Sequence, residues 1–408
     1  MNPVAALAHL GVLTLQVSAT LAHSRSKRHI PAHRAVGQCV PEFLERLQSL
    51  IRPKREVAIQ QFLQQASHYG RPLIDGSTLY LFYSGRARRV SVPGDLNEWD
   101  PDKTVMTRVP GTNFHYCAIQ LHRRARIEYR LAVDSTWILD PYNHQQAMGG
   151  SGPNSEVAMP GYRQPSELTW RASAPNGTID AMEFTSKLLN RSHPVFVYRP
   201  HGYDRSRRFY PSLYVLDGGD YLSLGMMATV LDNLIACRRI RPIIVVFVEP
   251  RTNITRPATN KRTIDYTLSD VFVSSLTREL RQMIEGKYRV KPEEKDRAIM
   301  GASLGGLLAT YAAYKHPRVF SLCAAQSPSY WWRNQSVTRM IADGPVRPVK
   351  FYLDTGTIQD SLDLTRAMRN VLQRKGYRYS YSEYHEGHNW GNWRARIASI
   401  LEYFWGLP

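Results

Sequence analysis

The chain of 408 residues contains only four cysteines, and they lie far apart. They form no C-x-x-C pair and no cluster with histidine, which argues against both a disulfide framework and a zinc site of common spacing. We therefore expect them to be core residues. Their positions are Cys39, Cys117, Cys237 and Cys323.

Acidic residues are scarce, because 34 Asp and Glu stand against 53 Lys and Arg and leave a formal net charge of +19. A positive field of this size attracts anionic partners, whether nucleic acid, anionic lipid or an acidic small molecule. Only 11 of the basic residues are lysines, and the arginines are spread over the whole chain. A nucleic-acid-binding protein has a basic face and a recognisable binding module, so this scatter argues against nucleic acid as the partner.

Long apolar runs are missing beyond the first residues. A mean hydropathy of -0.38, with 43% hydrophobic residues, is typical of a folded globular protein and not of a polytopic membrane protein. Residues 1–22 resemble the apolar region of a signal peptide, but no Lys or Arg precedes them, and His9 and Gln16 interrupt them. We expect no membrane-spanning segment. The charge order favours a cytoplasmic enzyme with a disordered leader over residues 1–36, with export as the alternative.

The length predicts two domains, because one domain typically has ~100–200 residues. Residues 39–65 have apolar residues at helical spacing on both sides of Pro53, which predicts two short amphipathic helices. Short alternating runs then predict a small immunoglobulin-like β-sandwich, so the first domain covers residues 37–165. The predicted strands are 78–83, 89–92, 116–121 and 127–133.

In the second domain, residues 166–408, short apolar runs alternate with helical patterns such as 270–284 and 307–314. This alternation predicts an α/β fold with an open, mostly parallel sheet and a site at the carboxyl ends of the strands. The predicted strands are 195–198, 212–216, 242–248, 297–300, 322–325, 349–353 and 379–384.

One motif in this domain carries chemistry. The run 301–305, Gly-Ala-Ser-Leu-Gly, fits G-x-S-x-G and lies between a predicted strand and a predicted helix. This context is typical of the nucleophile elbow of α/β-hydrolases, in which glycines allow a tight turn that exposes the serine hydroxyl. The motif therefore predicts that Ser303 is a nucleophile.

A serine nucleophile needs a base, normally a histidine that a carboxylate orients. In α/β-hydrolases the base follows the nucleophile and the acid along the chain. Beyond the nucleophile the histidines are His316, His385 and His388. We expect His388 to be the base, because it lies between the last predicted strand and the final helix, and His385 is the alternative.

The orienting acid is expected in the loop after strand 349–353. Asp360 is our first candidate, with Asp354 and Asp363 as alternatives. Asp360 also fits the N-cap of the helix that follows, and both roles are compatible.

An oxyanion hole needs two backbone N–H groups directed at one point. The residue after the nucleophile, Leu304, is expected to supply the first. Gly219 is expected to supply the second from the glycine-rich loop after strand 212–216, with Gly218 in reserve, although the same glycines also fit a plain tight turn.

These motifs resemble a known family. The runs 198–203, 213–220, 301–306 and 387–390 are similar to the esterase D-like group, and the runs 93–101, 137–143 and 152–162 resemble the sandwich domain that precedes enterochelin esterases, some feruloyl esterases and glycan-branching enzymes. As a whole, from about residue 70 onward, the chain is most similar to enterochelin (enterobactin) esterases. That group often has Glu in the acid loop, where this chain has Gln359-Asp360.

The resemblance implies a serine esterase that cleaves a catecholate siderophore and releases iron, with Ser303, His388 and Asp360 as its triad. The mechanism requires no metal or organic cofactor. A ferric catecholate is an anion with flat aromatic arms, so we expect Arg251, Arg262, Trp331 and Trp332 to bind it, with Arg256 nearby. The alternative is that the arginines are solvated loop charges and that one of the two tryptophans lies in the core.

Two other hypotheses remain. The same triad would serve a feruloyl or acetyl esterase acting on polysaccharide, and an exposed Trp99 in the sandwich that stacks on a sugar would favour this substrate. The structural alternative is that Trp99 and Trp137 are buried in turns and bind no sugar. The third hypothesis is a glycan-binding or scaffolding protein whose hydrolase domain is silent.

Overall fold

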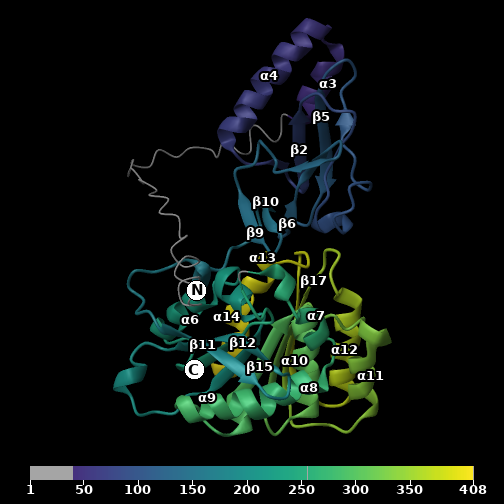
Figure 1. Cartoon of the computed structure of the whole chain (residues 1–408). Helices are drawn as coiled ribbons and strands as arrows, with labels where there is room; N and C mark the ends of the chain where they lie inside the picture. Colours follow the sequence, from purple (N-terminus) through teal and green to yellow (C-terminus); the bar gives the residue numbers. More distant parts are fainter. Residues whose placement is uncertain (1–39, 255, 408) are drawn as a thin grey trace. The chain divides into compact units, whose positions relative to one another are not determined.

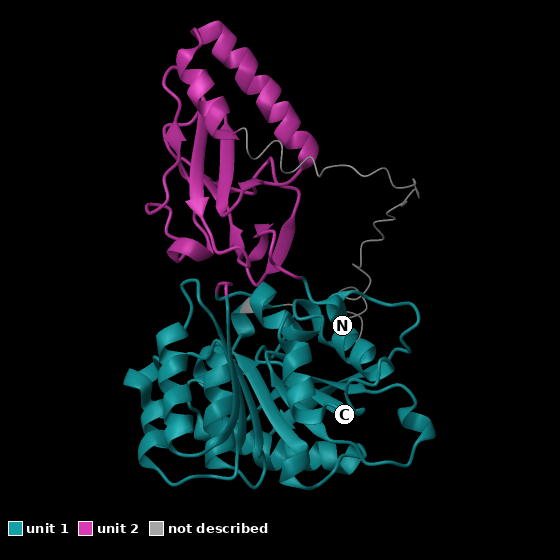
Figure 2. Ribbon diagram, turned by 180° about the vertical axis from the view of Figure 1, so that it is seen from behind, with its two compact units in different colours: residues 1–15, 164–384, 388–408 teal, residues 16–163, 385–387 magenta. Residues whose placement is uncertain are grey.

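The computed structural model describes residues 40–254 and 256–407. They form two compact units, which Figure 2 shows in different colours. Within the described chain, unit 1 comprises residues 164–384 and 388–407, and unit 2 comprises residues 40–163 together with the short segment 385–387. The predictions for the leader and for Cys39 lie outside the described residues.

Unit 2 begins with the two predicted helices, α3 (Val40–Ser49) and α4 (Arg52–Tyr69). Pro53 lies in the first turn of α4, where a missing N–H leaves no helical hydrogen bond unmade. The apolar sides of both helices pack on a four-stranded antiparallel sheet through Phe43, Phe62 and Phe114, and the rings of Phe43 and Phe62 stack with centroids 4.1 Å apart. The helices are therefore part of the core of this unit.

Three antiparallel sheets make up the rest of unit 2, with strand orders β1-β2-β5-β4, β6-β10-β9 and β3-β7-β8. The predicted run 127–133 is divided between two of them, because β6 ends at Tyr129 and β7 begins at Leu131. The strands are β1 (Leu73–Asp75), β2 (Thr78–Ser84), β3 (Val90–Ser91), β4 (Thr107–Arg108), β5 (Phe114–Gln120), β6 (Arg126–Tyr129), β7 (Leu131–Val133), β8 (Thr136–Ile138), β9 (Gln146–Gly149) and β10 (Gly152–Ala158).

A buried ionic cluster lies in unit 2. The fully buried guanidinium of Arg126 faces three carboxylates, those of Glu128 at 2.9 Å, Glu156 at 2.7 Å and Glu386 at 3.8 Å. The backbone N–H of Arg126 donates to the carbonyl of His385, so the segment 385–387 is held by backbone and side-chain contacts. This segment lies far along the chain from the rest of the unit, and its membership was not predicted.

Unit 1 is built on an eight-stranded sheet of order β11-β12-β14-β13-β15-β16-β17-β18. Figure 1 labels β11, β12, β15 and β17 of this sheet. The neighbouring strands β14, β13, β15, β16, β17 and β18 pair in parallel. At one edge, β12 pairs antiparallel with β14 and β11 pairs antiparallel with β12. A mostly parallel α/β sheet is therefore confirmed, and only β11 was missed. The strands are β11 (Thr178–Ser186), β12 (Arg191–Arg199), β13 (Ser212–Leu216), β14 (Ile244–Val248), β15 (Arg297–Ala302), β16 (Leu322–Gln326), β17 (Lys350–Gly356) and β18 (Arg378–Tyr384).

Helices cover both faces of this sheet, each over its own apolar cluster. One face carries α8 (Asp270–Ser274), α9 (Arg281–Lys287), α10 (Leu304–Lys315), α11 (Trp332–Asp343) and α12 (Leu362–Arg374), and the other carries α5 (Gly218–Ser223), α6 (Met227–Ala236), α13 (Trp390–Arg394) and α14 (Ile397–Trp405), while α7 (Arg262–Tyr266) lies beside α10. No helix among the described residues is long and apolar enough to cross a bilayer.

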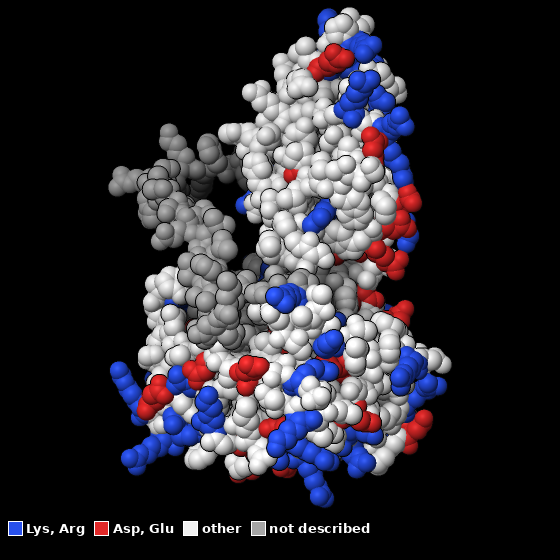
Figure 3. Space-filling view, in the orientation of Figure 1, with Lys and Arg blue, Asp and Glu red and all other residues white. Residues whose placement is uncertain are grey.

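The sequence predicted how the basic residues are distributed and where the cysteines lie. Figure 3 shows Lys and Arg scattered over the visible face, with acidic side chains among them, as the spread of arginines along the chain indicated. Cys323 is buried and Cys117 is half-buried, but Cys237 is exposed. The prediction that the cysteines are core residues is therefore wrong for Cys237, which lies at the end of α6.

Candidate active site

Ser303 lies in the sharp turn between β15 and α10, at the carboxyl end of a central strand. Its backbone has φ 58° and ψ -122°, a conformation that a non-glycine residue avoids. A Cβ on Gly301 would come within 2.5 Å of the Gly305 backbone, so the turn closes only with glycine there. The sequence thus dictates a strained turn that presents the serine hydroxyl.

His388 lies between β18 and α13, and its ring connects two groups. The hydroxyl of Ser303 donates to Nε2 at 3.0 Å, and the Nδ1–H group donates to Asp360 Oδ1 at 2.7 Å. The edge of the ring meets Trp393 with centroids 5.0 Å apart at 89°. The other two candidate histidines lie elsewhere, since His316 caps the end of α10 and His385 belongs to unit 2.

Asp360 lies in the loop between β17 and α12 with its side chain buried. Oδ2 accepts from the Ser327 hydroxyl and from the Gly356 N–H, both at 2.6 Å. Burial opposes ionisation, but the contact with His388 and these two donors hold the pKa of Asp360 below its usual value. The carboxylate is therefore charged where it faces the imidazole.

The two alternative acids lie in other surroundings. Asp354 is buried in β17, where Gln326 Nε2 donates to it at 3.3 Å. Asp363 is exposed on the first turn of α12 and lies 3.7 Å from Arg366. The structure thus brings Ser303, His388 and Asp360 together, and it brings neither alternative acid to the imidazole.

The two expected oxyanion donors differ in their surroundings. Leu304 is the first residue of α10, directly after the nucleophile. The N–H of Gly219 donates instead to the buried carboxylate of Glu249 at 3.1 Å. The amide that the sequence pattern reserved for an oxyanion therefore already has an acceptor in this structure.

Both predicted substrate arginines have carboxylate partners. Arg262 binds Asp217 with two hydrogen bonds, of 2.7 and 3.0 Å, and donates to the carbonyl of Ala302 at 3.1 Å. Arg251 contacts Glu249 and lies 2.8 Å from Asp220. These ion pairs fix the loop after β13 and the end of β15, and substrate binding by either arginine stays a prediction.

The two predicted tryptophans have different environments. Trp331 is 53% exposed, whereas Trp332 packs against the core of unit 1. Their rings meet at 64° with centroids 5.6 Å apart. Of the two, Trp331 has the free surface that a flat ligand needs.

Residues that no motif indicated also contact the site. Ser327 and Ser329 follow β16, and Trp393 lies on α13. For the two serines, the only sequence signal is the position of polar residues at the carboxyl end of a strand next to β15. Strand neighbours are not visible in a sequence, so this signal became specific only with the sheet order.

Comparison with known proteins places the chain in a family. The family model described as "Putative esterase" matches residues 186–404, more than half of the chain. The chain belongs to this family. It is a carboxylic ester hydrolase, and the α/β-hydrolase-like fold expected from the elbow motif is confirmed.

Relatives of this esterase agree with the predicted resemblance. The solved Ferric Enterobactin Esterase from Salmonella typhimurium has a TM-score of 0.69 at 19% identity, over 80% of this chain and 93% of that chain. The Iron(III) enterobactin esterase of Dickeya dadantii is 24% identical over 307 residues, which are 68% of this chain and 67% of that protein. The Endo-1,4-beta-xylanase/feruloyl esterase of Xylanibacter ruminicola is 26% identical over 201 residues, which are 47% of this chain and 27% of that protein.

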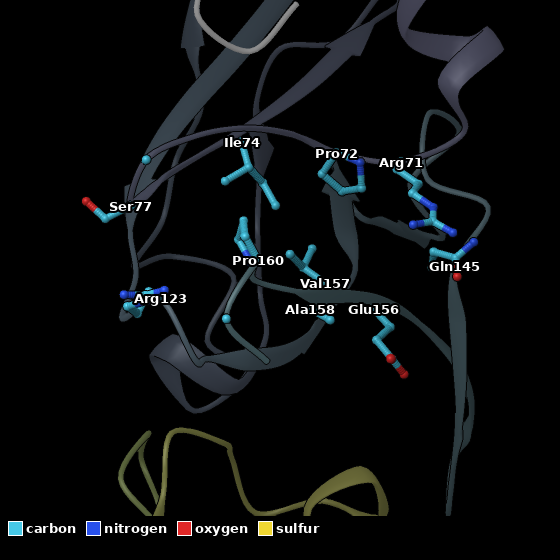
Figure 4. A pocket seen from close by; sticks show the side chains of 12 residues that line it. Arg71, Pro72, Ile74, Ser77, Arg123, Gln145, Glu156, Val157, Ala158 and Pro160 are labelled. Atoms are coloured by element: carbon cyan, nitrogen blue, oxygen red, sulfur yellow. The ribbon is translucent and has the colours of Figure 1, made fainter. Parts of the chain in front are cut away.

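Unit 2 of this esterase has a hollow of its own, of about 780 Å³ (Figure 4). Ile74, Val157 and Pro160 form its apolar centre, with Arg71 and Arg123 toward its two ends. All of its lining residues belong to unit 2, and the sequence-predicted site residues are not among them.

Proposed function

We propose that the chain is a serine esterase that hydrolyses the ester bonds of a catecholate siderophore through Ser303, His388 and Asp360. The observation that carries the proposal is the continuous hydrogen-bond chain from the Ser303 hydroxyl through both ring nitrogens of His388 to Asp360. Nucleophile, base and orienting acid have the mutual geometry that acyl transfer needs.

The chemistry follows from that order. His388 Nε2 takes the proton of Ser303 as Oγ attacks the ester carbonyl carbon, and Asp360 stabilises the imidazolium. The tetrahedral intermediate collapses when the imidazolium returns the proton to the leaving alkoxide, which leaves an acyl-enzyme. Water activated by His388 then hydrolyses the acyl-enzyme and restores Ser303.

The substrate class rests on chemistry and on relatives. Several similar proteins are described as enterobactin esterases, among them the Salmonella and Dickeya proteins. A ferric catecholate is anionic and aromatic, which fits the net charge of +19 and the exposed ring of Trp331. Release of the iron would follow from cleavage of the trilactone into linear fragments.

The test is product analysis of ferric enterobactin incubated with the purified chain, with Ser303→Ala as the matched control. We expect linear dihydroxybenzoyl-serine fragments from the wild type alone, and the variant to bind the substrate nearly unchanged. Equal turnover by both proteins contradicts the assignment of Ser303.

A second candidate is a feruloyl or acetyl esterase of polysaccharides. The observation that favours it is in unit 2, where Trp99 and Trp137 lie nearly parallel at 11° with centroids 6.4 Å apart and Trp137 is 40% exposed. Exposed indole faces stack on sugar rings. An intact trilactone, with release of ferulate from a feruloylated xylan oligosaccharide, would favour this candidate.

A further inference from the structure

Three residues between β16 and α11, Ser327-Pro328-Ser329, are buried and have no part in the proton transfers described above. Their backbone is fastened to the elbow, because the Ser303 N–H donates to the carbonyl of Gln326 at 2.9 Å and the Ser329 N–H donates to the carbonyl of Ser303 at 3.0 Å. The segment therefore runs along the nucleophile with fixed backbone contacts.

The first serine contacts the acid end of the triad. Its hydroxyl lies 2.6 Å from Asp360 Oδ2 and 3.1 Å from the indole nitrogen of Trp393. An indole N–H can only donate, so the Ser327 hydroxyl accepts a hydrogen bond from Trp393 and donates one to the carboxylate of Asp360. Oδ1 of the same carboxylate is then left to face His388.

The second serine contacts the nucleophile end. Ser329 Oγ lies 3.3 Å from Ser303 Oγ. The Ser303 hydroxyl donates its single hydrogen bond to His388 Nε2 at 3.0 Å, so its oxygen can only accept from Ser329. Ser329 is therefore the donor of this contact. The contact directs the Ser303 proton toward the imidazole.

The link between the two hydroxyls is stiff. The ring of Pro328 fixes its φ near −65°, and Ser327 has φ 40°, in the left-handed region that non-glycine residues avoid. A Cβ on Gly306 of α10 would come within 3.1 Å of Pro328 Cβ, so the segment also packs closely on that helix. Strain of this kind persists where the surroundings enforce it and is common at functional sites.

We propose that Ser327 and Ser329 are positioning residues of the esterase, which hold the carboxylate of Asp360 and the nucleophile oxygen of Ser303 at the two ends of His388. The inference rests on the proposed function. One rigid tripeptide then sets the distance between the acid and the nucleophile, so that both hydrogen bonds of His388 are made before a substrate arrives.

The first test compares Ser327→Ala and Ser329→Ala with the wild type on p-nitrophenyl acetate. Because the binding surface is unchanged, kcat is expected to fall about tenfold in each variant with KM changed less than twofold. Ser329→Thr, which keeps the hydroxyl, is expected to recover most of the kcat. Ser275→Ala is the matched control, because Ser275 is a buried serine of unit 1 whose hydroxyl donates to the carbonyl of Phe272.

Wild-type kcat in both variants, or a rise in KM with kcat unchanged, would overturn the proposal. A second measurement does not depend on turnover. In the proton NMR spectrum, the hydrogen bond from His388 Nδ1–H to Asp360 is expected to give a low-field resonance, which is assigned by its absence in His388→Gln. This resonance is expected to shift in Ser327→Ala and not in Ser275→Ala. An unshifted resonance rejects the role of Ser327. A shifted resonance in a chain that hydrolyses no ester supports the positioning role and rejects the proposed function.

Discussion

At the residue scale, the site depends on a few side chains whose roles follow from what each one touches. The serine could be predicted because the strained turn requires glycines at fixed spacing, which a sequence shows directly. Asp360 could be named only with alternatives, because three aspartates follow the predicted strand 349–353 and the sequence does not show which one meets His388. The serines after β16 could not be predicted at all.

Asp360→Asn is expected to lower kcat by about three to four orders of magnitude, because the amide cannot stabilise the imidazolium and favours the wrong tautomer of His388. The measurement is kcat on p-nitrophenyl acetate, with the exposed Asp363→Asn as the matched control. A loss of less than tenfold would assign the acid elsewhere.

The same carboxylate links stability to pH. Its pKa is lower in the folded chain than in the unfolded chain, so its contribution to stability is present above the unfolded value of ~3.9 and is lost as the pH falls through the folded value. Asp360→Asn is expected to reduce the fall in the free energy of unfolding across this acid window and to leave its pH dependence above about pH 5 unchanged. Urea unfolding at a series of pH values checks this, and an unchanged acid window contradicts it.

At the scale of elements, most of the predicted strands of unit 1 match the structure within two residues at either end, because buried parallel strands are short apolar runs. The exceptions are β12, which begins four residues before the predicted run, and β17, which ends three residues after it. β11 escaped prediction for the opposite reason. It is an edge strand, most of its residues are partly or fully exposed, and its sequence has no apolar run. In unit 2, the change of sheet between β6 and β7 was invisible because only the half-buried Arg130 separates them.

The ionic cluster on β6 gives a test at this scale. Arg126→Met removes the cation facing the buried carboxylates of Glu128 and Glu386, and leaving buried charges without their partner costs about 3–5 kcal/mol. We expect a lower free energy of unfolding of that order in urea titrations. Arg126→Lys, which keeps the charge, is expected to lose less, and equal losses in both variants would contradict an electrostatic cause.

At the scale of the whole molecule, the excess of basic residues affects how an anionic substrate arrives. If the substrate is a ferric catecholate, kcat/KM is expected to fall several-fold between about 0.05 and 0.5 M salt, because salt screens the attraction. The uncharged p-nitrophenyl acetate is the matched control and is expected to change little. Equal salt dependence for both esters would show that the field has no part in substrate capture.

Unit 2 is built from two segments that lie far apart along the chain, and this has a consequence for synthesis of the chain. The last partner of Arg126, Glu386, leaves the ribosome more than two hundred residues after residue 163. At the usual 5–20 residues per second, that delay is roughly ten to forty-five seconds. During that time nascent unit 2 lacks one of its own buried acids, so it reaches its final set of contacts only after residue 386 has been synthesised.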